Sequence, residues 1–550
     1  MTAEARTELP ADATGAPSLT LDDAQLGDLE LLLSGAFAPL AGFMGAADVA
    51  AVLERGTLAD GTPWPVPVTL DVSPDAVPED AASVLLTDAE GTPLAVLDIA
   101  ERSEVQVMRP ARHTGPGRLS GESWGGRPPG PALTRLSGQV TGLREPEHGP
   151  FRRLMRRPAE AREALGDGPV LAYATRGPVH GRQIGQLRHM AGLLKARLLL
   201  LPLVAGPAEV VTRPEALVRA VLAAAASLPP ATMVIPVPLA PRRPVFGTGP
   251  AGELSVRALV AAAYGATHLM ADDGPADASP SHDSAAGDDP GAALSPGRPI
   301  EIVRAGDWAY DPRAEVWRPL ALIEAGAERG DLSPGELGDL LDAGAEVPAW
   351  FTPPAVAREL RRARPPRAER GFVLFLTGLS GSGKSTIARN LRDALAERGD
   401  RKVSLLDGDL VRQLLSAGLT FSRADRDLNI VRIGFVAAEI ARHGGIAICA
   451  PIAPYAQARA QVREMVSDVG DFLLIHVATP LEVCEARDRK GLYAKARAGQ
   501  IKHFTGISDP YEEPTDADLT IDTSTMTREQ ATDAVLGLLT AGGWLSPAQG

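Results

Sequence analysis

The sequence predicts an α/β protein of several domains, one of them built on a parallel sheet. Its 550 residues exceed the size of one ordinary domain. A short apolar run, GFVLFLT (371–377), has the length and composition of a buried strand. It is followed by the glycine-rich GLSGSGKST (378–386), and then by Ile387, Leu391 and Leu395, which recur with the period of an amphipathic helix. Strand, glycine loop and helix in this order are typical of a phosphate-binding P-loop.

Other apolar runs predict further elements of the same kind. GLLKARLLLLPLVAG (192–206) is interrupted by two charges and a proline, so it predicts a helix end, a loop and a buried strand rather than a membrane span. LVRAVLAAAASL (217–228) predicts a helix, and ATMVIPVPL (231–239) predicts a strand. KVSLLDGD (402–409) predicts a second strand next to the P-loop, ending in two acidic residues.

Composition narrows the class of protein. The hydrophobic fraction of 45% is ordinary for globular domains. A net charge of −14 argues against a general binder of nucleic acids or anionic membranes. The two cysteines, Cys449 and Cys484, form no C-x-x-C pattern, which indicates a reducing cytoplasm and no structural zinc. The polar start of the chain has no apolar segment of the secretory type.

The P-loop motif predicts an ATP site. Its glycines let backbone N–H groups converge on phosphate oxygens, and the positive end of the following helix adds to that field. Lys384 is expected to reach the β- and γ-phosphates, and the hydroxyl of Ser385 to ligate Mg²⁺. The alternative is a glycine-rich turn without function. The predicted ATP-binding residues of the loop are Gly378, Leu379, Ser380, Gly381, Ser382, Gly383, Lys384, Ser385 and Thr386.

The segments after the P-loop carry a resemblance to one kinase family. They include GLTFSRADRDLNIVR (418–432), IAICAPIAPY (446–455) and the long stretch from GDFLLIHVATPLEVCEARDRKGLYAKARAGQ to IKHFTGISDPYEEP (470–514). In this order and spacing they closely resemble adenylylsulfate (APS) kinase, from about Gly371 to Thr523. The resemblance implies transfer of the γ-phosphate of MgATP to the 3′-hydroxyl of APS, which gives PAPS.

The same resemblance implies roles for individual residues. Phe421 is expected to stack on the adenine of APS, and fork-shaped guanidinium groups to hold its phosphosulfate. Arg487 is expected in a lid over ATP. Lys384 and Asp409 are the expected catalytic residues, the second orienting or deprotonating the hydroxyl, and Ser385 and Asp409 are the expected Mg²⁺ ligands. The other expected substrate-binding residues are Asp407, Arg412, Arg426, Asn429, Lys502, Phe504, Thr505, Gly506 and Ile507.

One position departs from the family pattern. Many APS kinases have a serine in an I-S-P sequence, described in some cases as forming a phosphoserine, whereas this chain has Ala453 between Ile452 and Pro454. Without a hydroxyl, no phospho-enzyme can form there. Direct in-line transfer needs only positioning and charge stabilisation, so activity is expected without the serine.

The first two thirds of the chain resemble ATP sulfurylase. ELLLSGAFAPLAGFMGAADVAAVLERG (30–56), LAYATRGPVHGRQ (171–183) and GTGPAGELSVRALVAAAYGATHLMADD (247–273) are among the matching segments. The resemblance implies a β-rich PUA-like domain at 1–150, a Rossmann-like nucleotidyltransferase domain at 151–345, a linker at 346–369 and the P-loop kinase at 370–550. A polar segment at 273–299 has the composition of a disordered insertion.

The sulfurylase site loops, however, have lost most of their phosphate-binding groups. The family reads Q-x-R-N-P-x-H-x-x-H at the first loop; this chain keeps only Arg176 and His180 of its polar residues. The second loop, G-R-D-H-A-G in the family, reads ADDGPA at 271–276. Each lost donor costs on the order of 10²–10³ in rate. Arg182 or Gln183 would have to compensate.

These observations predict an APS kinase with a vestigial sulfurylase site at Arg176 and His180. For the N-terminal part of the chain, the prediction is a regulatory or oligomerisation module without catalytic activity. The alternative is a working ATP sulfurylase, which would make the chain bifunctional. A second alternative is a kinase region that only senses nucleotides. Expected partners are ATP, APS and further copies of the chain, with neither nucleic acid nor membrane, in the cytoplasm.

Overall fold

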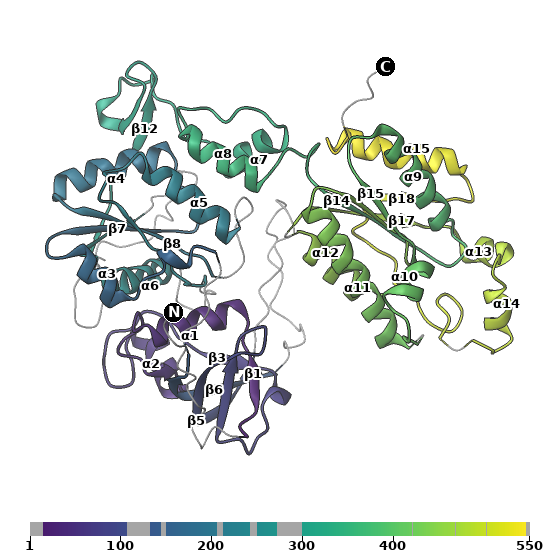
Figure 1. The fold of residues 1–550 in the computed structure, drawn as a ribbon, viewed down its shortest axis with the longest axis horizontal. Helices are drawn as coiled ribbons and strands as arrows, with labels where there is room; N and C mark the ends of the chain where they lie inside the picture. The colour runs from purple at the N-terminus through teal and green to yellow at the C-terminus, as the bar shows by residue number, and fades with distance from the viewer. Residues whose placement is uncertain are drawn as a thin grey trace, which may run out of the picture. The chain divides into compact units, whose positions relative to one another are not determined.

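The computed structural model describes residues 15–106, 132–144, 150–205, 213–241, 250–271, 300–420, 422–467, 469–501 and 503–545. The chain forms two compact units, which are described separately (Figure 1). The first unit is Met1–Gly338 with Val347–Ala363, and the second is Asp339–Glu346 with Arg364–Gly550. The predicted insertion at 273–299 lies outside the described residues.

The first unit begins with a mainly antiparallel sheet. Its order is β1 (Ser18–Thr20), β4 (Ser83–Thr87), β5 (Pro93–Gln106), β6 (Ala132–Gly142) and β2 (Gly42–Phe43), with β3 (Leu70–Val72) also paired to β6. Helices α1 (Asp23–Leu33) and α2 (Ala46–Arg55) accompany it. Asp22 starts α1 by accepting hydrogen bonds from the amides of Ala24 and Gln25 at 3.0 and 2.8 Å. The predicted β-rich N-terminal domain is confirmed.

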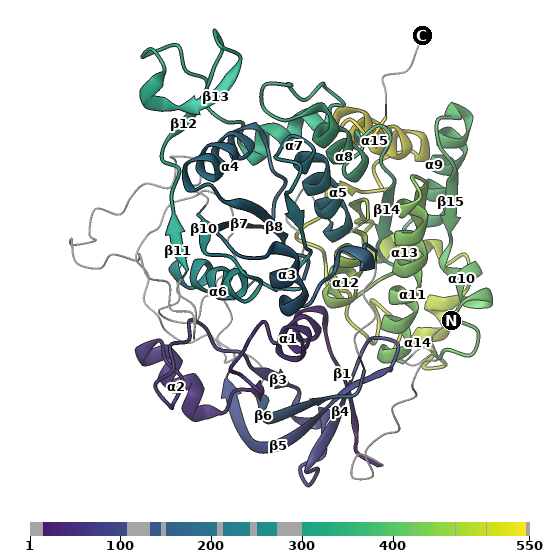
Figure 2. The ribbon, with the colours of Figure 1, turned by 60° about the vertical axis from the view of Figure 1, so that its left-hand side comes forward.

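A parallel sheet follows in the same unit, in the order β11 (Glu301–Val303), β10 (His268–Met270), β7 (Val170–Thr175), β8 (Arg197–Pro202) and β9 (Met233–Val234). Figure 2 shows α4 (Gly181–Leu194) and α5 (Pro214–Ala225) on one face of this sheet, and α3 (Pro158–Leu165) and α6 (Pro250–Ala263) on the other. All six residues of β7 are buried, as expected of a central parallel strand. The predicted Rossmann-like architecture is therefore present.

Of the three sequence predictions for this region, two are confirmed and one overestimated the length of a strand. The predicted helix at 217–228 lies largely within α5, and the run 192–206 is the predicted helix end, loop and buried strand. The predicted strand at 231–239 is much shorter, since only Met233 and Val234 have strand pairing in β9. Pro236 and Pro238 have no N–H to donate to a ladder, which limits regular pairing to the residues before them.

The rest of the first unit is a small hairpin and helical segment. The hairpin joins β12 (Trp308–Asp311) to β13 (Val316–Pro319), and α8 (Pro354–Ala363) follows later in the chain. Val356 and Leu360 of α8 are fully buried, within the segment predicted as a linker. Helix α7 (Pro334–Asp342) precedes it and is divided between the units, with residues to Gly338 in the first and residues from Asp339 in the second. Short 3-10 helices lie at Pro74–Ala76, Arg152–Leu154 and Leu320–Leu322.

The second unit contains a five-stranded parallel sheet in the order β15 (Val403–Leu406), β16 (Ile446–Cys449), β14 (Phe372–Thr377), β17 (Asp471–Val477) and β18 (Leu519–Ile521). Figure 1 shows α9 (Lys384–Arg398) and α15 (Arg528–Ala541) on one face, and α11 (Arg423–Arg442) and α12 (Ala456–Ser467) on the other. Three shorter helices, α10 (Gly408–Leu414), α13 (Leu481–Arg487) and α14 (Leu492–Arg497), complete the unit.

The chain order of these strands locates a site. After the central strand β14 the chain builds one side of the sheet with β15 and β16, and then crosses to β17 and β18 on the other side. Ligands of open parallel sheets bind outside the carboxyl ends of the strands at such a switch point. The loop after β14 is the predicted P-loop. In the described part of the chain, no helix is long and apolar enough to cross a membrane.

Candidate active site

The P-loop is shaped by glycines that no other residue could replace without strain. Gly378, Gly381 and Gly383 have φ angles of 149°, 79° and 106°. A Cβ atom on Gly378 would lie 2.4 Å from the carbonyl oxygen of Val477. The loop therefore runs close against β17 and delivers the chain into α9, which begins at Lys384. Ser385 and Thr386 lie in the first turn of this helix, the positive end of its dipole, which attracts anions.

Lys384 lies inside this loop. Its ammonium donates to the carbonyl oxygens of Gly378 at 2.9 Å and Leu379 at 2.7 Å, and the residue is 6% exposed. A phosphate oxygen is a stronger acceptor than a neutral carbonyl because the hydrogen bond is then formed between two charges.

Several side chains outside the motif support the loop from behind. Thr479 and Thr523 both donate to the carbonyl oxygen of Ser382, at 3.0 and 2.8 Å. Arg487 donates to Thr523 Oγ1 and to the Thr523 carbonyl, both at 2.8 Å, which places the predicted lid arginine beside the P-loop. Tyr493, which the sequence analysis did not single out, donates its hydroxyl to the carbonyl oxygen of Ser380 at 2.8 Å.

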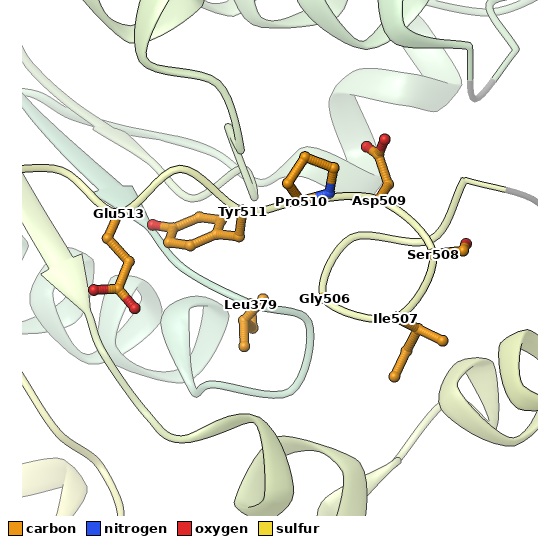
Figure 3. A pocket seen from close by; sticks show the side chains of 8 residues that line it. All are labelled: Leu379, Gly506, Ile507, Ser508, Asp509, Pro510, Tyr511 and Glu513. Carbon is orange, nitrogen blue, oxygen red and sulfur yellow. The ribbon is translucent and has the colours of Figure 1, made fainter.

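A cavity of about 530 Å³ opens beside the loop. Figure 3 shows Leu379 of the P-loop facing a second loop that carries Gly506 and Ile507. These three residues were predicted from two separate motifs, one for ATP and one for APS, and the fold brings them to one cavity. The wall continues through residues that carried no predicted role, namely Ser508, Asp509, Pro510, Tyr511 and Glu513.

Arg426, Asn429 and Thr505 form the buried part of the predicted substrate site. Arg426 and Asn429 lie on one face of α11 and are 9% and 5% exposed. Arg426 donates to Thr505 Oγ1 at 3.1 Å. Among the described residues, Arg426 Nε and Asn429 Oδ1 are buried without a hydrogen-bond partner. Buried polar atoms are normally satisfied, so part of the hydrogen-bonding capacity of Arg426 and Asn429 is unused in this structure.

The remaining predicted residues are less closely grouped. Asp407 follows β15, and its carboxylate lies 3.8 Å from Arg389 of α9, one helical turn beyond Ser385. Arg412 is directed to the carbonyl oxygen of Thr420 at 3.2 Å. Phe504 packs edge-on against Tyr493 with ring centroids 5.0 Å apart. Phe421, Lys502 and the side chain of Asp409 lie outside what the structure describes.

Ala453 occupies a closed position rather than the surface of the site. It is 1% exposed and has a φ of 45°. Its carbonyl oxygen accepts a hydrogen bond from Arg459 at 2.8 Å. The backbone here is fixed by neighbouring side chains, and the methyl group points into packed protein.

The chain matches three protein families along its length. The family described as a PUA-like domain matches residues 1–114, ATP-sulfurylase matches 152–363 and adenylylsulphate kinase matches 370–522. Proteins named sulfate adenylyltransferase from Phaeosphaeria nodorum and Mycosarcoma maydis are each 37% identical to it, over 98% and 97% of this chain and 96% of each relative. This chain belongs to the ATP-sulfurylase and APS kinase family.

A solved structure gives the same result for the fold. A protein described as a hexameric APS kinase from Thiobacillus denitrificans matches with 34% identity and a TM-score of 0.72, over 98% of this chain and 96% of that one. Residues 370–522 are therefore an APS kinase domain, and 152–363 an ATP-sulfurylase domain, as the motifs predicted.

In the sulfurylase domain, Arg176 is engaged by a carboxylate of the same domain. Its guanidinium pairs with Glu253 at 3.1 Å and donates to the carbonyl oxygen of Leu239 at 2.8 Å. Glu253 also pairs with Arg257 at 3.1 Å. Arg176 is thus part of an ion-pair network that links the end of β7 to α6.

His180 is likewise held by its surroundings. It precedes α4, its Nδ1 lies 3.0 Å from Thr352 Oγ1, and its ring stacks on Phe351 with centroids 4.3 Å apart. Burial, and then the nearby charge of Arg182, lower the pKa of His180 to about 3. The imidazole is neutral at physiological pH and brings no positive charge to the loop.

The two residues that could compensate are also occupied. Arg182 pairs with Asp331 at 2.8 Å. The side-chain oxygen of Gln183 accepts a hydrogen bond from the amide of His180 at 3.2 Å, as part of the cap of α4. Of the second loop, only Ala271 is among the described residues.

Proposed function

We propose that the kinase domain transfers the γ-phosphate of ATP to the 3′-hydroxyl of APS at the carboxyl edge of its sheet. The observation that carries this proposal is the cavity at which the P-loop residue Leu379 meets Gly506 and Ile507 of the APS-type loop. A phosphate donor on the P-loop and an acceptor against that loop would lie next to each other. Direct transfer requires this proximity, because the reaction has no covalent intermediate to carry the group between sites.

Different residues bind the two substrates, ATP and APS. Lys384 and the amides at the start of α9 bind the phosphates and neutralise charge as the phosphoryl group moves. Arg426 and Asn429 hold the phosphosulfate end of APS, and Arg412, Phe421, Lys502, Phe504 and Thr505 complete its pocket. Asp409, in the first turn of α10 after β15, orients the 3′-hydroxyl or accepts its proton.

The donor set on this edge of the sheet fits Mg²⁺. The ion prefers hard oxygen ligands, one or two from the protein and the others from phosphates and water. Ser385 and Asp409 would provide them, with Asp407 close to the same face of α9. When bound with ATP, Mg²⁺ supplies charge neutralisation between the β- and γ-phosphates.

We further propose that the sulfurylase domain makes no APS. Arg176 and His180, the retained members of the motif, are respectively ion-paired and neutral, and Arg182 and Gln183 are engaged elsewhere. The second candidate is a bifunctional enzyme. One observation favours it, since the fungal relatives that align over 96% of their length are named sulfate adenylyltransferase.

Two assays on one preparation separate these candidates. The first follows ATP-dependent conversion of APS to PAPS, and the second follows pyrophosphate release from ATP with sulfate or molybdate. We expect robust kinase turnover and sulfurylase turnover at least about 1,000-fold lower, because several donors worth on the order of 10²–10³ each are missing. Sulfate-dependent turnover that disappears in His180→Ala would instead establish the bifunctional enzyme.

Two properties of the whole protein complete the proposal. The chain assembles into a homo-oligomer, as the relative described as hexameric does, and sedimentation of the full chain tests this. It works in the cytoplasm, in keeping with Cys449 and Cys484, which are buried free thiols.

A further inference from the structure

Tyr455 and Asp509 contact the same guanidinium from two different parts of the kinase domain. Tyr455 immediately precedes α12 and is 2% exposed. Asp509 belongs to the loop that lines the cavity beside the P-loop. Both lie in segments that resemble APS kinase, but neither residue had a predicted role in binding or catalysis.

The contacts form a closed triangle around Arg426. Arg426 Nη2 donates to the hydroxyl of Tyr455 at 2.7 Å and to Asp509 Oδ2 at 2.5 Å. The Tyr455 hydroxyl donates to the same Asp509 oxygen at 2.5 Å. Nη1 donates a hydrogen bond to Thr505, so hydrogen bonds to both terminal nitrogens fix the orientation of the guanidinium. Nε is left as the buried donor without a partner among the described residues.

The protonation states of Tyr455 and Asp509 are consistent with these hydrogen bonds. Burial and the bond to Asp509 raise the pKa of Tyr455 to about 12, so the hydroxyl remains a donor at physiological pH. Burial opposes ionisation of Asp509, but the hydrogen bonds from Tyr455 and Arg426 keep the pKa of that carboxyl below its usual value. A second guanidinium, that of Arg423, lies over the Tyr455 ring at 4.3 Å.

We propose that Tyr455 and Asp509 are positioning residues, which hold Arg426 in the orientation that binds the phosphosulfate of APS. The inference rests on the proposed function, in which Arg426 is an APS-binding residue. A flexible arginine loses rotamer freedom when it binds an anion, and a guanidinium already fixed by its neighbours loses less. The two residues therefore act on APS affinity through Arg426 rather than on the P-loop.

A double-mutant cycle in the full chain tests this inference. Tyr455→Phe keeps the ring and removes only the hydroxyl, so KM for APS is expected to rise about 5- to 10-fold, the loss of roughly one hydrogen bond. KM for ATP and kcat are expected to stay within about twofold. Arg426→Ala is expected to raise KM for APS by about 100-fold or more, since it removes charged contacts. In the Arg426→Ala background, Tyr455→Phe should add nothing.

The controls separate positioning from stability. Arg442→Ala removes an exposed arginine from the far end of the same helix, where it pairs with Glu439, and should leave both KM values unchanged. Asp509→Asn keeps the shape of the side chain and removes its charge. It should give the same APS-selective change as Tyr455→Phe, and it replaces that variant in the cycle if Tyr455→Phe does not fold.

Three results would overturn the inference. One is an unchanged KM for APS in Tyr455→Phe and Asp509→Asn. Another is a full additional loss when either change is combined with Arg426→Ala. The third is a parallel rise of KM for ATP and APS with lower thermal stability, which would make the triangle only a structural cross-link. If Arg426→Ala alone leaves KM for APS unchanged, the assignment of Arg426 in the proposed function fails instead.

Discussion

Asp342 forms ion pairs that hold a short segment of chain against the kinase domain, although this segment lies well before the P-loop in the sequence. The segment Asp339–Glu346 belongs to the same compact unit as residues from Arg364 onward. Asp342 pairs with Arg364 and Arg370, each at 2.6 Å, and with Arg367 at 3.2 Å. We predict that Asp342→Asn, which keeps the shape of the side chain and removes the charge, destabilises the kinase domain.

The magnitude follows from the electrostatics. Burial opposes ionisation of Asp342, yet hydrogen bonds from Arg364 and Arg370 and their charges lower the pKa of its carboxyl from 3.8 to about 2. At about 1.4 kcal/mol per unit, this shift is worth roughly 2–3 kcal/mol of folding free energy. Its side chain is only 9% exposed, so little of this is screened by solvent. For a domain of this size the loss lowers the midpoint of thermal unfolding by about 5–10 °C.

The assay is residual APS kinase activity after brief heating across a range of temperatures. Glu346→Gln is the matched control, because Glu346 is an exposed carboxylate of the same segment. Since the folded pKa lies below the unfolded one, the stabilisation is complete above about pH 5 and is lost as the pH falls through 4 toward 2. The difference between wild type and Asp342→Asn should shrink over that acidic range. Equal inactivation midpoints for Asp342→Asn, Glu346→Gln and wild type at pH 7 would refute the reasoning.

Four further outcomes are expected for the kinase domain. Lys384→Ala should lower kcat by at least about 100-fold without unfolding the protein, because it removes a charge aimed at the migrating phosphoryl group; wild-type turnover would exclude that role. Asp409→Asn should also act mainly on kcat, measured at saturating APS and ATP. With labelled ATP and no APS, no acid-stable phosphoryl-enzyme should accumulate, and a stoichiometric label on a serine anywhere in the chain would contradict direct transfer. A fragment beginning at Pro365 lacks Asp342 and should inactivate at lower temperature than the full chain, as Asp342→Asn does.

The sequence was sufficient for features set by local chemistry. The strand, glycine loop and helix around Lys384 follow from apolar periodicity and from backbone angles that only glycine adopts readily. The meeting of Leu379 with Gly506 and Ile507 could be expected because their motifs both belong to one family. The predicted length of strand β9 was too great, because the prediction used apolar content and did not consider that Pro236 and Pro238 have no N–H groups.

What could not be predicted depends on contacts between distant segments. Tyr493 reaches Ser380 across 113 positions of the sequence, and Tyr455 reaches Asp509 across 54. Neither tyrosine lies in a recognisable motif for binding or catalysis, and a single tyrosine is more often a packing residue than a site residue. The only sequence signal for the two tyrosines was their position, because both lie in segments that resemble APS kinase. That resemblance assigned neither of them a role.

In the sulfurylase domain, two residues of the family motif have structural roles that do not depend on catalysis. Arg176 links the end of β7 to the carbonyl of Leu239 and to Glu253 in α6, and Arg257 joins the same carboxylate. Removing Arg176 would leave the carbonyl without this donor and weaken the pairing of a partly buried acid, both of which lower stability. His180 similarly contacts Thr352 and Phe351, which lie just before α8. The fold itself therefore accounts for both residues, and their presence is no argument for sulfate activation by this chain.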